Sequence, residues 1–182
     1  MNENKISVRY SKALFQTALE KNALEEVMKD LDILKQAYYE KHFHYILHSP
    51  AVKISEKKKY MESLLKDSIH EITYNFLILL IDNKREAFLK RIARQFLLSY
   101  NHHHNIKMVL LTTAGPVDDE LRKQITHLIE DHYKAQVELR ECVNPDLLGG
   151  FILNIDDYQF DGSLITQLQR IKRKFSETSF LN

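Results

Sequence analysis

The sequence predicts a mostly α-helical protein, in which an N-terminal six-helix bundle is followed by a small α/β unit. Three observations predict this fold class. Apolar residues recur at helical spacing through residues 1–105, whereas short, strand-like apolar segments first appear beyond residue 105. All 4 glycines of the 182-residue chain also lie beyond that point. We therefore predict two domains, residues 1–105 and residues 106–182.

Six segments of the first domain are predicted to be helices, because most place their apolar residues on one helix face. They are residues 6–18, 24–38, 42–49, 55–65, 69–83 and 88–100. Ser55 is the expected N-cap of the fourth helix. In the fifth, one face carries Ile69, Ile72, Phe76, Leu79, Leu80 and Asn83. Residues 76–81 are apolar on every side, which fits either a buried helix or a short buried strand.

The second domain is predicted to run strand, helix, strand, strand, strand, helix. The strands are expected at residues 107–113, 135–141, 151–155 and 158–161. Acidic residues 118–120 suit the start of the first helix. Its expected buried stripe is Leu121, Ile125, Leu128 and His132. Asp156-Asp157 is the expected turn between the last two strands, and Ser163 the expected cap of the final helix.

Composition narrows the functional classes. Lys and Arg number 26 against 25 Asp and Glu, so the net charge of +1 gives no overall field for nucleic acid or a membrane surface. The longest apolar run, residues 76–81, is far shorter than the roughly 20 residues that span a bilayer. The N-terminus does not resemble a signal peptide, and one cysteine cannot form an internal disulfide. A cytoplasmic protein is expected.

Motifs of catalysis are missing from the sequence. It contains no GxxxxGK[ST] loop, no GxGxxG fingerprint and no GxSxG elbow, so we expect no catalytic residue and no cofactor. Cys142 is expected to be buried in a strand. His44 and His48 are spaced to share a metal, but no HExxH pattern accompanies them, and we expect no metal site. The basic run at residues 170–174 fits either nucleic acid or an acidic protein helix.

The C-terminal segment LLGGFILNIDDYQFDGSLITQLQRIKRKF resembles the signature of the delta subunit family of bacterial F-type ATP synthases, whose mitochondrial counterpart is the oligomycin-sensitivity-conferring protein. The matching residues are Leu148, Gly149, Gly150, Phe151, Asp161, Gly162, Ser163 and Leu168. The N-terminal segment VRYSKALFQTALEK is similar to the first helix of that family, and matches it at Arg9, Tyr10, Ala13, Leu14, Phe15 and Ala18. Ser11 replaces the usual alanine. HSPAVKISEKK and NFLILLIDNKR are also similar to family segments.

This resemblance implies a non-catalytic stator subunit in proton-driven ATP synthesis, present in one copy per complex. In the family, the N-terminal bundle binds the N-terminal helix of an α subunit in a groove between its first and fifth helices. The C-terminal part engages the C-terminal end of the peripheral-stalk b subunit. The implied location is the cytoplasmic face of the bacterial cell membrane, as a peripheral protein without membrane insertion and without nucleic acid.

Three sets of residues are expected to carry this function. The groove for the α subunit is expected at Tyr10, Ala13, Leu14, Thr17, Ala18, Leu77, Leu80 and Ile81, although each also fits plain bundle core. The signature residues, with Gly149-Gly150 at a bulge or close backbone approach and Gly162 in a turn, are expected to be mainly structural. The expected stalk contacts are Arg170, Arg173 and Lys174.

Two other classes fit the sequence less well. One is a helical RNA-binding or regulatory adaptor protein, which steep salt dependence of nucleic-acid binding would indicate. The other is a metal-dependent enzyme that uses the histidine-rich segments, which stoichiometric metal in the purified protein would indicate.

Overall fold

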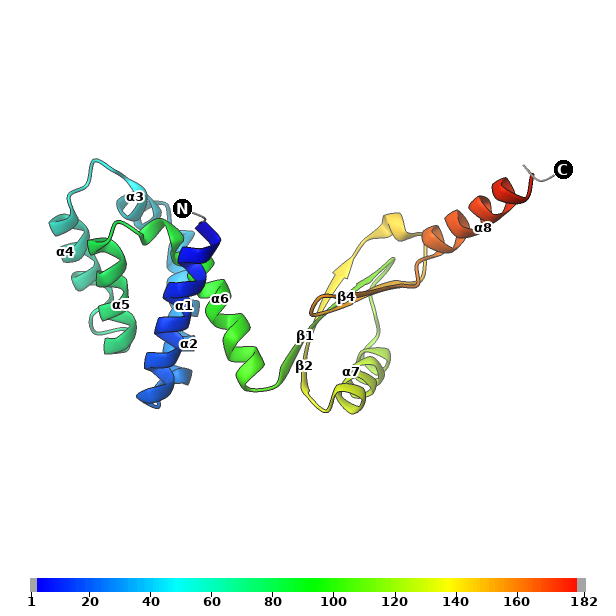
Figure 1. The fold of residues 1–182 in the computed structure, drawn as a ribbon, viewed down its shortest axis with the longest axis horizontal. Helices are drawn as coiled ribbons and strands as arrows, with labels where there is room; N and C mark the ends of the chain where they lie inside the picture. Colours follow the sequence, from blue (N-terminus) through cyan, green and yellow to red (C-terminus); the bar gives the residue numbers. More distant parts are fainter. Residues whose placement is uncertain (1–2, 180–182) are drawn as a thin grey trace. The chain divides into compact units, whose positions relative to one another are not determined.

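The computed structural model describes the backbone of residues 3–179 and the side chains of residues 4–173. The chain separates into two compact units, residues 1–100 and residues 101–182 (Figure 1). It is mostly helical, with one small four-stranded sheet in the second unit. The boundary between the units lies a few residues before the composition change at residue 105. It falls inside a helix that ends at His103.

Helices fill the first unit. They are α1 (Glu3–Glu20), α2 (Leu24–Tyr38), α3 (Lys41–His48), α4 (Ile54–Leu65), α5 (Glu71–Asp82), the short 3-10 helix η1 (Glu86–Phe88) and α6 (Leu89–His103). Residues 76–81 lie within α5, so the helical alternative for this segment is confirmed. The expected cap at Ser55 is wrong: α4 begins one residue earlier, after Lys53, and Lys53 makes no side-chain capping bond.

The core of the first unit combines apolar packing with one buried ion pair. Large side chains such as Phe43, Met61 and Phe96 are fully buried between the helices. Lys57 on α4 donates a hydrogen bond of 2.6 Å to Glu86 and another of 2.8 Å to the carbonyl oxygen of Leu47. The charged group of Lys57 is thereby paired although its side chain is only 6% exposed. These bonds tie α4 to the end of α3 and to η1.

A four-stranded sheet in the order β2-β1-β3-β4 organises the second unit. Its strands are β1 (Ile106–Thr113), β2 (Gln136–Val143), β3 (Phe151–Ile155) and β4 (Tyr158–Asp161). β1 and β2 are parallel, with Val109 opposite Leu139, and are joined through α7 (Asp119–Tyr133) as a βαβ unit. β3 is antiparallel to both β1 and β4, with Val109 also opposite Ile155.

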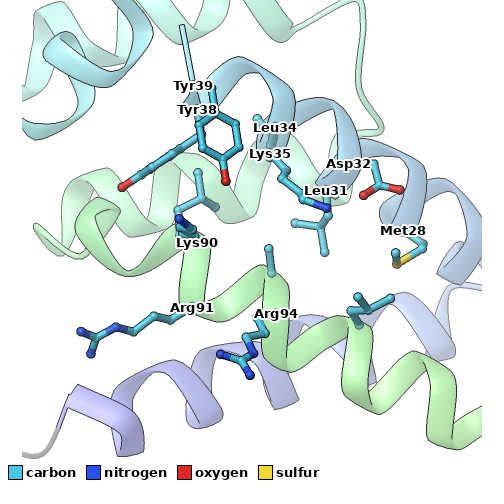
Figure 2. A pocket seen from close by; sticks show the side chains of 13 residues that line it. Met28, Leu31, Asp32, Leu34, Lys35, Tyr38, Tyr39, Lys90, Arg91 and Arg94 are labelled. Atoms are coloured by element: carbon cyan, nitrogen blue, oxygen red, sulfur yellow. The ribbon is translucent and has the colours of Figure 1, made fainter. Parts of the chain in front are cut away.

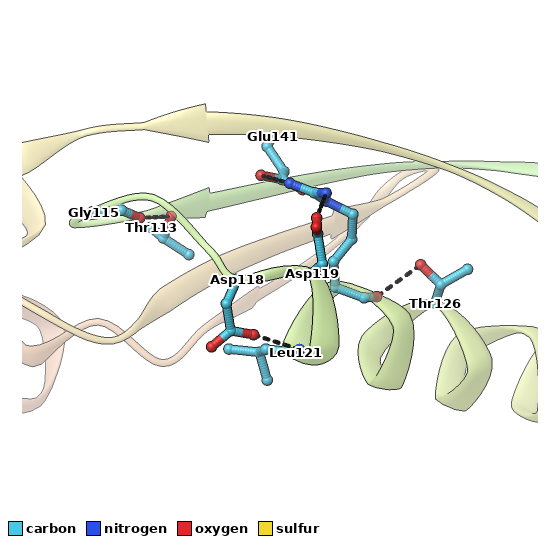
Figure 3. Close-up of polar contacts among 8 residues, drawn as sticks. Thr113, Gly115, Asp118, Asp119, Leu121, Thr126 and Glu141 are labelled. Carbon is cyan, nitrogen blue, oxygen red and sulfur yellow. Dashed lines mark hydrogen bonds and ion pairs between the residues drawn. The ribbon is translucent and has the colours of Figure 1, made fainter.

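The start of α7 is fixed by side chains. Asp118 accepts a 2.7 Å hydrogen bond from the backbone N–H of Leu121, as the sequence predicted for this acidic helix start (Figure 3). Arg122 on α7 pairs with Asp119 and with Glu141 on β2, so the helix is also tied to the sheet. The side-chain bonds of Arg122 lower the pKa of the Glu141 carboxyl below its ordinary value.

The predicted buried stripe of α7 is confirmed at Ile125 and wrong at Leu121, Leu128 and His132. Ile125, Ile129 and Tyr133 pack on the sheet, and Ile129 is fully buried. Leu128 is 69% exposed, and Leu121 and His132 are exposed as well. Because Leu128 and Ile129 are adjacent apolar residues, helical periodicity alone allowed either one to face the sheet.

The last helix, α8 (Leu164–Ser179), follows β4 directly. Ser163 caps it, as predicted, by accepting a 3.3 Å hydrogen bond from the backbone N–H of Thr166. Cys142, expected to be buried, is exposed, and it lies on the same face of β2 as the exposed residues Glu138 and Arg140. No helix among residues 3–179 is long and apolar enough to cross a membrane.

Candidate functional site

A groove of about 1100 Å³ lies between α1 and α5. The side chains that line it come from these two helices and from the segments that adjoin them. On the α1 side they are Ile6, Arg9, Tyr10, Ala13, Leu14, Thr17 and Lys21. On the α5 side they are His70, Glu71, Ile72, Asn75, Phe76, Leu79, Asn83 and Arg85.

The α1 side of the groove includes the small side chains of Ala13 and Thr17. Leu14 is almost fully buried, whereas Ala13 beside it is exposed and carries only a methyl group. Thr17, one turn further on, donates its hydroxyl to the carbonyl oxygen of Ala13 at 3.0 Å. The polar group of Thr17 is therefore satisfied within the helix. Another helix can approach closely along this line.

The α5 wall is apolar and aromatic. Phe76 meets Tyr10 of α1 in an edge-to-face contact, with 6.3 Å between ring centroids. Leu79 is 48% exposed, so a large apolar side chain stands in water at the groove. Ile72, one turn before Phe76, is half-buried. An apolar surface of this kind favours the burial of a partner's side chains.

The rim of the groove is mainly basic. The basic lining residues are Arg9 on α1, Lys21 just after α1 and Arg85 after α5, and the only acidic lining residue is Glu71. Arg9 and Lys21 are exposed to solvent, and Arg85 is half-buried. A partner with acidic residues beside an apolar face matches this arrangement.

Asp30 fixes α5 in place from the neighbouring helix α2. This carboxylate is buried and accepts hydrogen bonds from the backbone N–H of His70 at 2.8 Å and from the hydroxyl of Thr73 at 2.6 Å. His70 in turn accepts a 3.2 Å bond from the backbone N–H of Ile72. Asp30 and His70 thus each accept a hydrogen bond from a backbone N–H at the start of α5, and the Asp30 bonds tie this end of the groove wall to α2.

The structure separates the predicted groove residues into two groups. Tyr10, Ala13, Leu14 and Thr17 line the groove. Ala18, Leu77, Leu80 and Ile81 are fully buried in the bundle core and do not line it. On the α5 side, the lining residues Ile72, Phe76, Leu79 and the C-cap Asn83 lie on the face that the sequence had grouped together, whereas Glu71 and Asn75 do not. The polar Asn83 in that stripe was the signal that this face is open to water.

In the second unit, the glycine signature holds β3, β4 and the start of α8 together. Gly150 has φ +76°, and a Cβ atom there would lie 2.3 Å from the carbonyl oxygen of Gly162, which confirms a close backbone approach. The backbone N–H of Gly162 donates to the carbonyl oxygen of Phe151 at 2.9 Å, and that of Leu164 to Gly149 at 3.0 Å. At Gly162 itself, a Cβ atom would make only ordinary contacts.

Asp161 completes this junction. Its carboxylate accepts a 2.9 Å bond from the backbone N–H of Ser163 and a 2.8 Å bond from the hydroxyl of Thr166. The bond from the Ser163 backbone is the main cause that lowers the pKa of Asp161, with smaller contributions from the side chains of Ser163 and Thr166. The signature residues therefore lie at the junction of β3, β4 and α8, joined by these hydrogen bonds.

Large apolar side chains of the second unit remain uncovered. Leu164, Leu168 and Ile171 follow helical spacing along α8, and each is about half exposed. Phe151, Tyr158 and Phe160 on β3 and β4 are also exposed. The predicted stalk residues Arg170 and Arg173 lie on α8 and are exposed, whereas the side chain of Lys174 lies outside the described residues.

The histidine-rich segments form no metal centre within the described residues, where no three His, Cys, Asp or Glu side chains come together. His44 and His48 stack with 4.3 Å between ring centroids, and Tyr38 lies edge-on to both. Burial is the main cause that lowers the pKa of His48, and the neighbouring His44 lowers it further.

A helical unit with an apolar groove, together with a small α/β unit that exposes apolar side chains, defines a class of protein whose surfaces are suited to contact with other proteins. Comparison with known proteins identifies the family within this class. Residues 6–175 match the family model described as "ATP synthase delta (OSCP) subunit", and the chain belongs to this family.

Individual relatives agree along the whole length. The chain is 30% identical to the ATP synthase subunit delta of Christiangramia forsetii over 100% of this chain and 99% of that protein. It is 34% identical to the ATP synthase subunit delta of Amoebophilus asiaticus, over 94% of each chain. Among solved structures, a chain of the Toxoplasma gondii mitochondrial ATP synthase hexamer superposes with a TM-score of 0.74 and 27% identity, over 93% of this chain and 96% of that chain.

Proposed function

We propose that this protein is a non-catalytic stator subunit of an F-type ATP synthase. In this role it links the catalytic head to the peripheral stalk, so that the head does not turn with the rotor during proton-driven ATP synthesis. Family membership supports its place in the complex. The observation that carries the proposal is the apolar groove between α1 and α5, which has the form of a helix-binding surface.

The N-terminal helix of an α subunit is the proposed occupant of this groove. The apolar face of the incoming helix would bury Leu79 and the edge of the Tyr10–Phe76 pair. The small side chain of Ala13 would let that helix approach α1 closely. Acidic residues beside that face would meet the basic rim formed by Arg9, Lys21 and Arg85. Helices α1 to α6 act in this proposal as a six-helix bundle that carries the groove.

The C-terminal end of the b subunit is the proposed partner of the second unit. The sequence pointed only to the basic side chains Arg170, Arg173 and Lys174 as contacts. The exposed apolar stripe of α8 supports a larger surface, in which a stalk helix packs on Leu168 and its neighbours and the basic residues lie at the edge. One copy per complex, held peripherally at the cytoplasmic face of the membrane, completes the proposal.

Resistance to torque is the physical task of such a link. It requires tight binding at both ends and stiff elements between the binding surfaces, and it requires no reacting group. In the groove-bearing unit, the Asp30 bonds hold the start of α5, which forms one wall of the groove, and the buried Lys57–Glu86 pair ties α4 to η1.

Reconstitution tests this proposal. Membrane vesicles that carry the synthase without its delta subunit are supplied with the full chain, and proton-driven ATP synthesis is measured. We expect synthesis to depend on the added chain, while ATP hydrolysis by the detached head does not. Equal synthesis with and without the chain would contradict the stator role.

A further inference from the structure

A second hollow lies in the first unit, between α2 and α6, and it shares no lining residue with the groove between α1 and α5. Its volume is about 400 Å³, within the range of pockets that enclose small molecules. Figure 2 shows α2 side chains on one side and α6 side chains on the other. The role proposed above leaves this pocket without a function.

The floor of the pocket is apolar. Leu31, Leu34 and Leu89 belong to the bundle core and are almost fully buried. Ala93 and Leu97 continue the apolar surface along α6, one and two turns after Leu89. Ala93 is small, so it leaves space where a larger residue would fill the pocket.

The rim of the pocket is cationic. Lys35 from α2, and Lys90, Arg91 and Arg94 from α6, surround one carboxylate, Asp32, which gives the lining a net charge of +3. Among the described residues, Lys35, Lys90 and Arg94 form no ion pair. The Lys90 ammonium lies 5.4 Å from the ring centroid of Tyr39, an exposed aromatic residue at the mouth (Figure 2).

We propose that this pocket binds a small amphipathic anion, of which a medium-chain aliphatic carboxylate is the simplest example. The tail would cover the leucine floor and the space above Ala93, and its burial would supply the driving force. The carboxylate would accept charge-assisted hydrogen bonds from Lys35, Lys90 or Arg94. The pocket has little more than a third of the volume of the α1–α5 groove, which favours a small molecule over a protein helix.

Calorimetric titration of the full chain with decanoate, below its micelle-forming concentration, tests the proposal. We expect saturable one-to-one binding. Decanol has the same tail without the charge, and butyrate has the charge without the tail, so each should bind at least about tenfold more weakly, as expected when a charged contact or most of the apolar contact is lost. Absence of decanoate binding, or equal binding of decanol, would overturn the proposal.

Variants locate the site. Replacing Lys35→Gln and Lys90→Gln together should weaken decanoate binding about tenfold or more. The matched change Lys29→Gln, at an exposed α2 residue outside the pocket, should leave binding unchanged. Ala93→Phe should abolish binding by filling the pocket, with folding checked by circular dichroism. Equal losses in the double variant and in Lys29→Gln would show that decanoate binds elsewhere on the basic surface, and would also overturn the proposal.

Discussion

At the scale of single residues, Gly150 is the position where the backbone leaves least freedom. A side chain at Gly150 would be destabilising for two reasons. The backbone has a φ of +76°, and a Cβ atom would clash with the carbonyl oxygen of Gly162. We expect Gly150→Ala to lower the free energy of unfolding of the second unit by roughly 2–4 kcal/mol, since the left-handed conformation alone costs about 1–2 kcal/mol. Chemical denaturation monitored by amide signals of β3 and β4 measures this.

Gly115 is the matched control for that change, because a Cβ atom there meets nothing within 4 Å. We expect Gly115→Ala to change the free energy of unfolding by less than about 1 kcal/mol. Equal effects of the two substitutions would contradict the assignment of a close backbone approach to Gly150.

We expect His48 to make the stability of the first unit depend on pH. Burial, aided by the charge of nearby His44 and Lys57, lowers its pKa below the ordinary 6.5, and Glu86 opposes this only in part. The unfolded chain therefore binds a proton more readily than the folded chain. The resulting stability is complete above pH 6.5 and is lost as the pH falls from there through the lowered pKa.

We expect hydrogen-exchange protection of α1 to α6 to fall between pH 7 and pH 5 in the native protein and to fall less in His48→Phe. Phenylalanine keeps an aromatic ring against Tyr38 but cannot take up a proton. An identical pH dependence in the two proteins would show that His48 is not the responsible group.

Burial is the residue property that the sequence predicts least well. Cys142 lies in a strand, as expected, but it is exposed, because it is on the face of β2 that carries Glu138 and Arg140 and not on the face of Val137 and Leu139, which packs on the core. Leu77 and Leu79 are both apolar and only two residues apart, yet one is fully buried and the other is 48% exposed. Only the packing of whole helices separates them.

At the scale of elements, the position of α5 decides the width of the proposed groove. Asp30→Ala would leave the Thr73 hydroxyl and the His70 N–H without their acceptor. We expect the first unit to lose about 3 kcal/mol of unfolding free energy, since each hydrogen bond to a charged group contributes about 1.5–3 kcal/mol.

Asp32→Ala provides the control on the same helix, because Asp32 is exposed. We expect this change to stay within about 0.5 kcal/mol. Denaturant titrations of both variants measure the difference, and a loss at Asp30 no larger than that at Asp32 would contradict the capping role.

The apolar stripe of α8, unlike the Asp30 bonds, is exposed in the free chain. A substitution in it should therefore affect partner binding and not stability. Leu168 is 58% exposed, so Leu168→Asp should change stability by no more than about 0.5 kcal/mol. If the stripe binds a stalk helix, the same change should weaken binding to a peptide from the C-terminal end of the b subunit about tenfold or more. Gln169→Asp, an exposed neighbour with the same change of charge, should bind nearly as well as the native chain.

The sequence predicts whether a segment is a helix or a strand more accurately than it predicts which face of that segment is buried. Helical spacing placed the helices of the first unit, and the acidic start of α7 and the Ser163 cap of α8 were both confirmed. The buried face predicted for α7 was right at Ile125 but took Leu128 in place of Ile129, because two adjacent apolar residues satisfy the same periodicity. The α4 cap was wrong because a serine near a helix start need not be the capping residue.

At the scale of the whole molecule, the two units differ in how they use apolar surface. The first buries a large core and presents a hollowed, mostly apolar groove with a basic rim. The second has a small core around Val109, Ile129 and Ile155, and leaves long apolar side chains uncovered on β3, β4 and α8. Two separate apolar surfaces are consistent with the proposed link between two partners.

The composition change near residue 105 indicated this division, because turns and strands need glycine and proline where the helical unit does not. The structural boundary lies near residue 100. Tyr100 still belongs to the first unit, where its hydroxyl donates a 2.8 Å bond to Glu25; burial and this bond raise the pKa of Tyr100 to about 12.

Binding of the α-subunit helix in the α1–α5 groove is the central claim, and calorimetric titration of the full chain with a synthetic N-terminal peptide of the same organism's α subunit tests it most directly. We predict one-to-one binding, with amide shifts confined to residues 6–17 and 72–83. Ala13→Trp, which fills the groove, should weaken binding about tenfold or more, whereas Gln16→Trp, on the same helix outside the groove, should not. Failure of the folded chain to bind, or equal affinity of the Ala13→Trp variant and the native chain, would contradict the account.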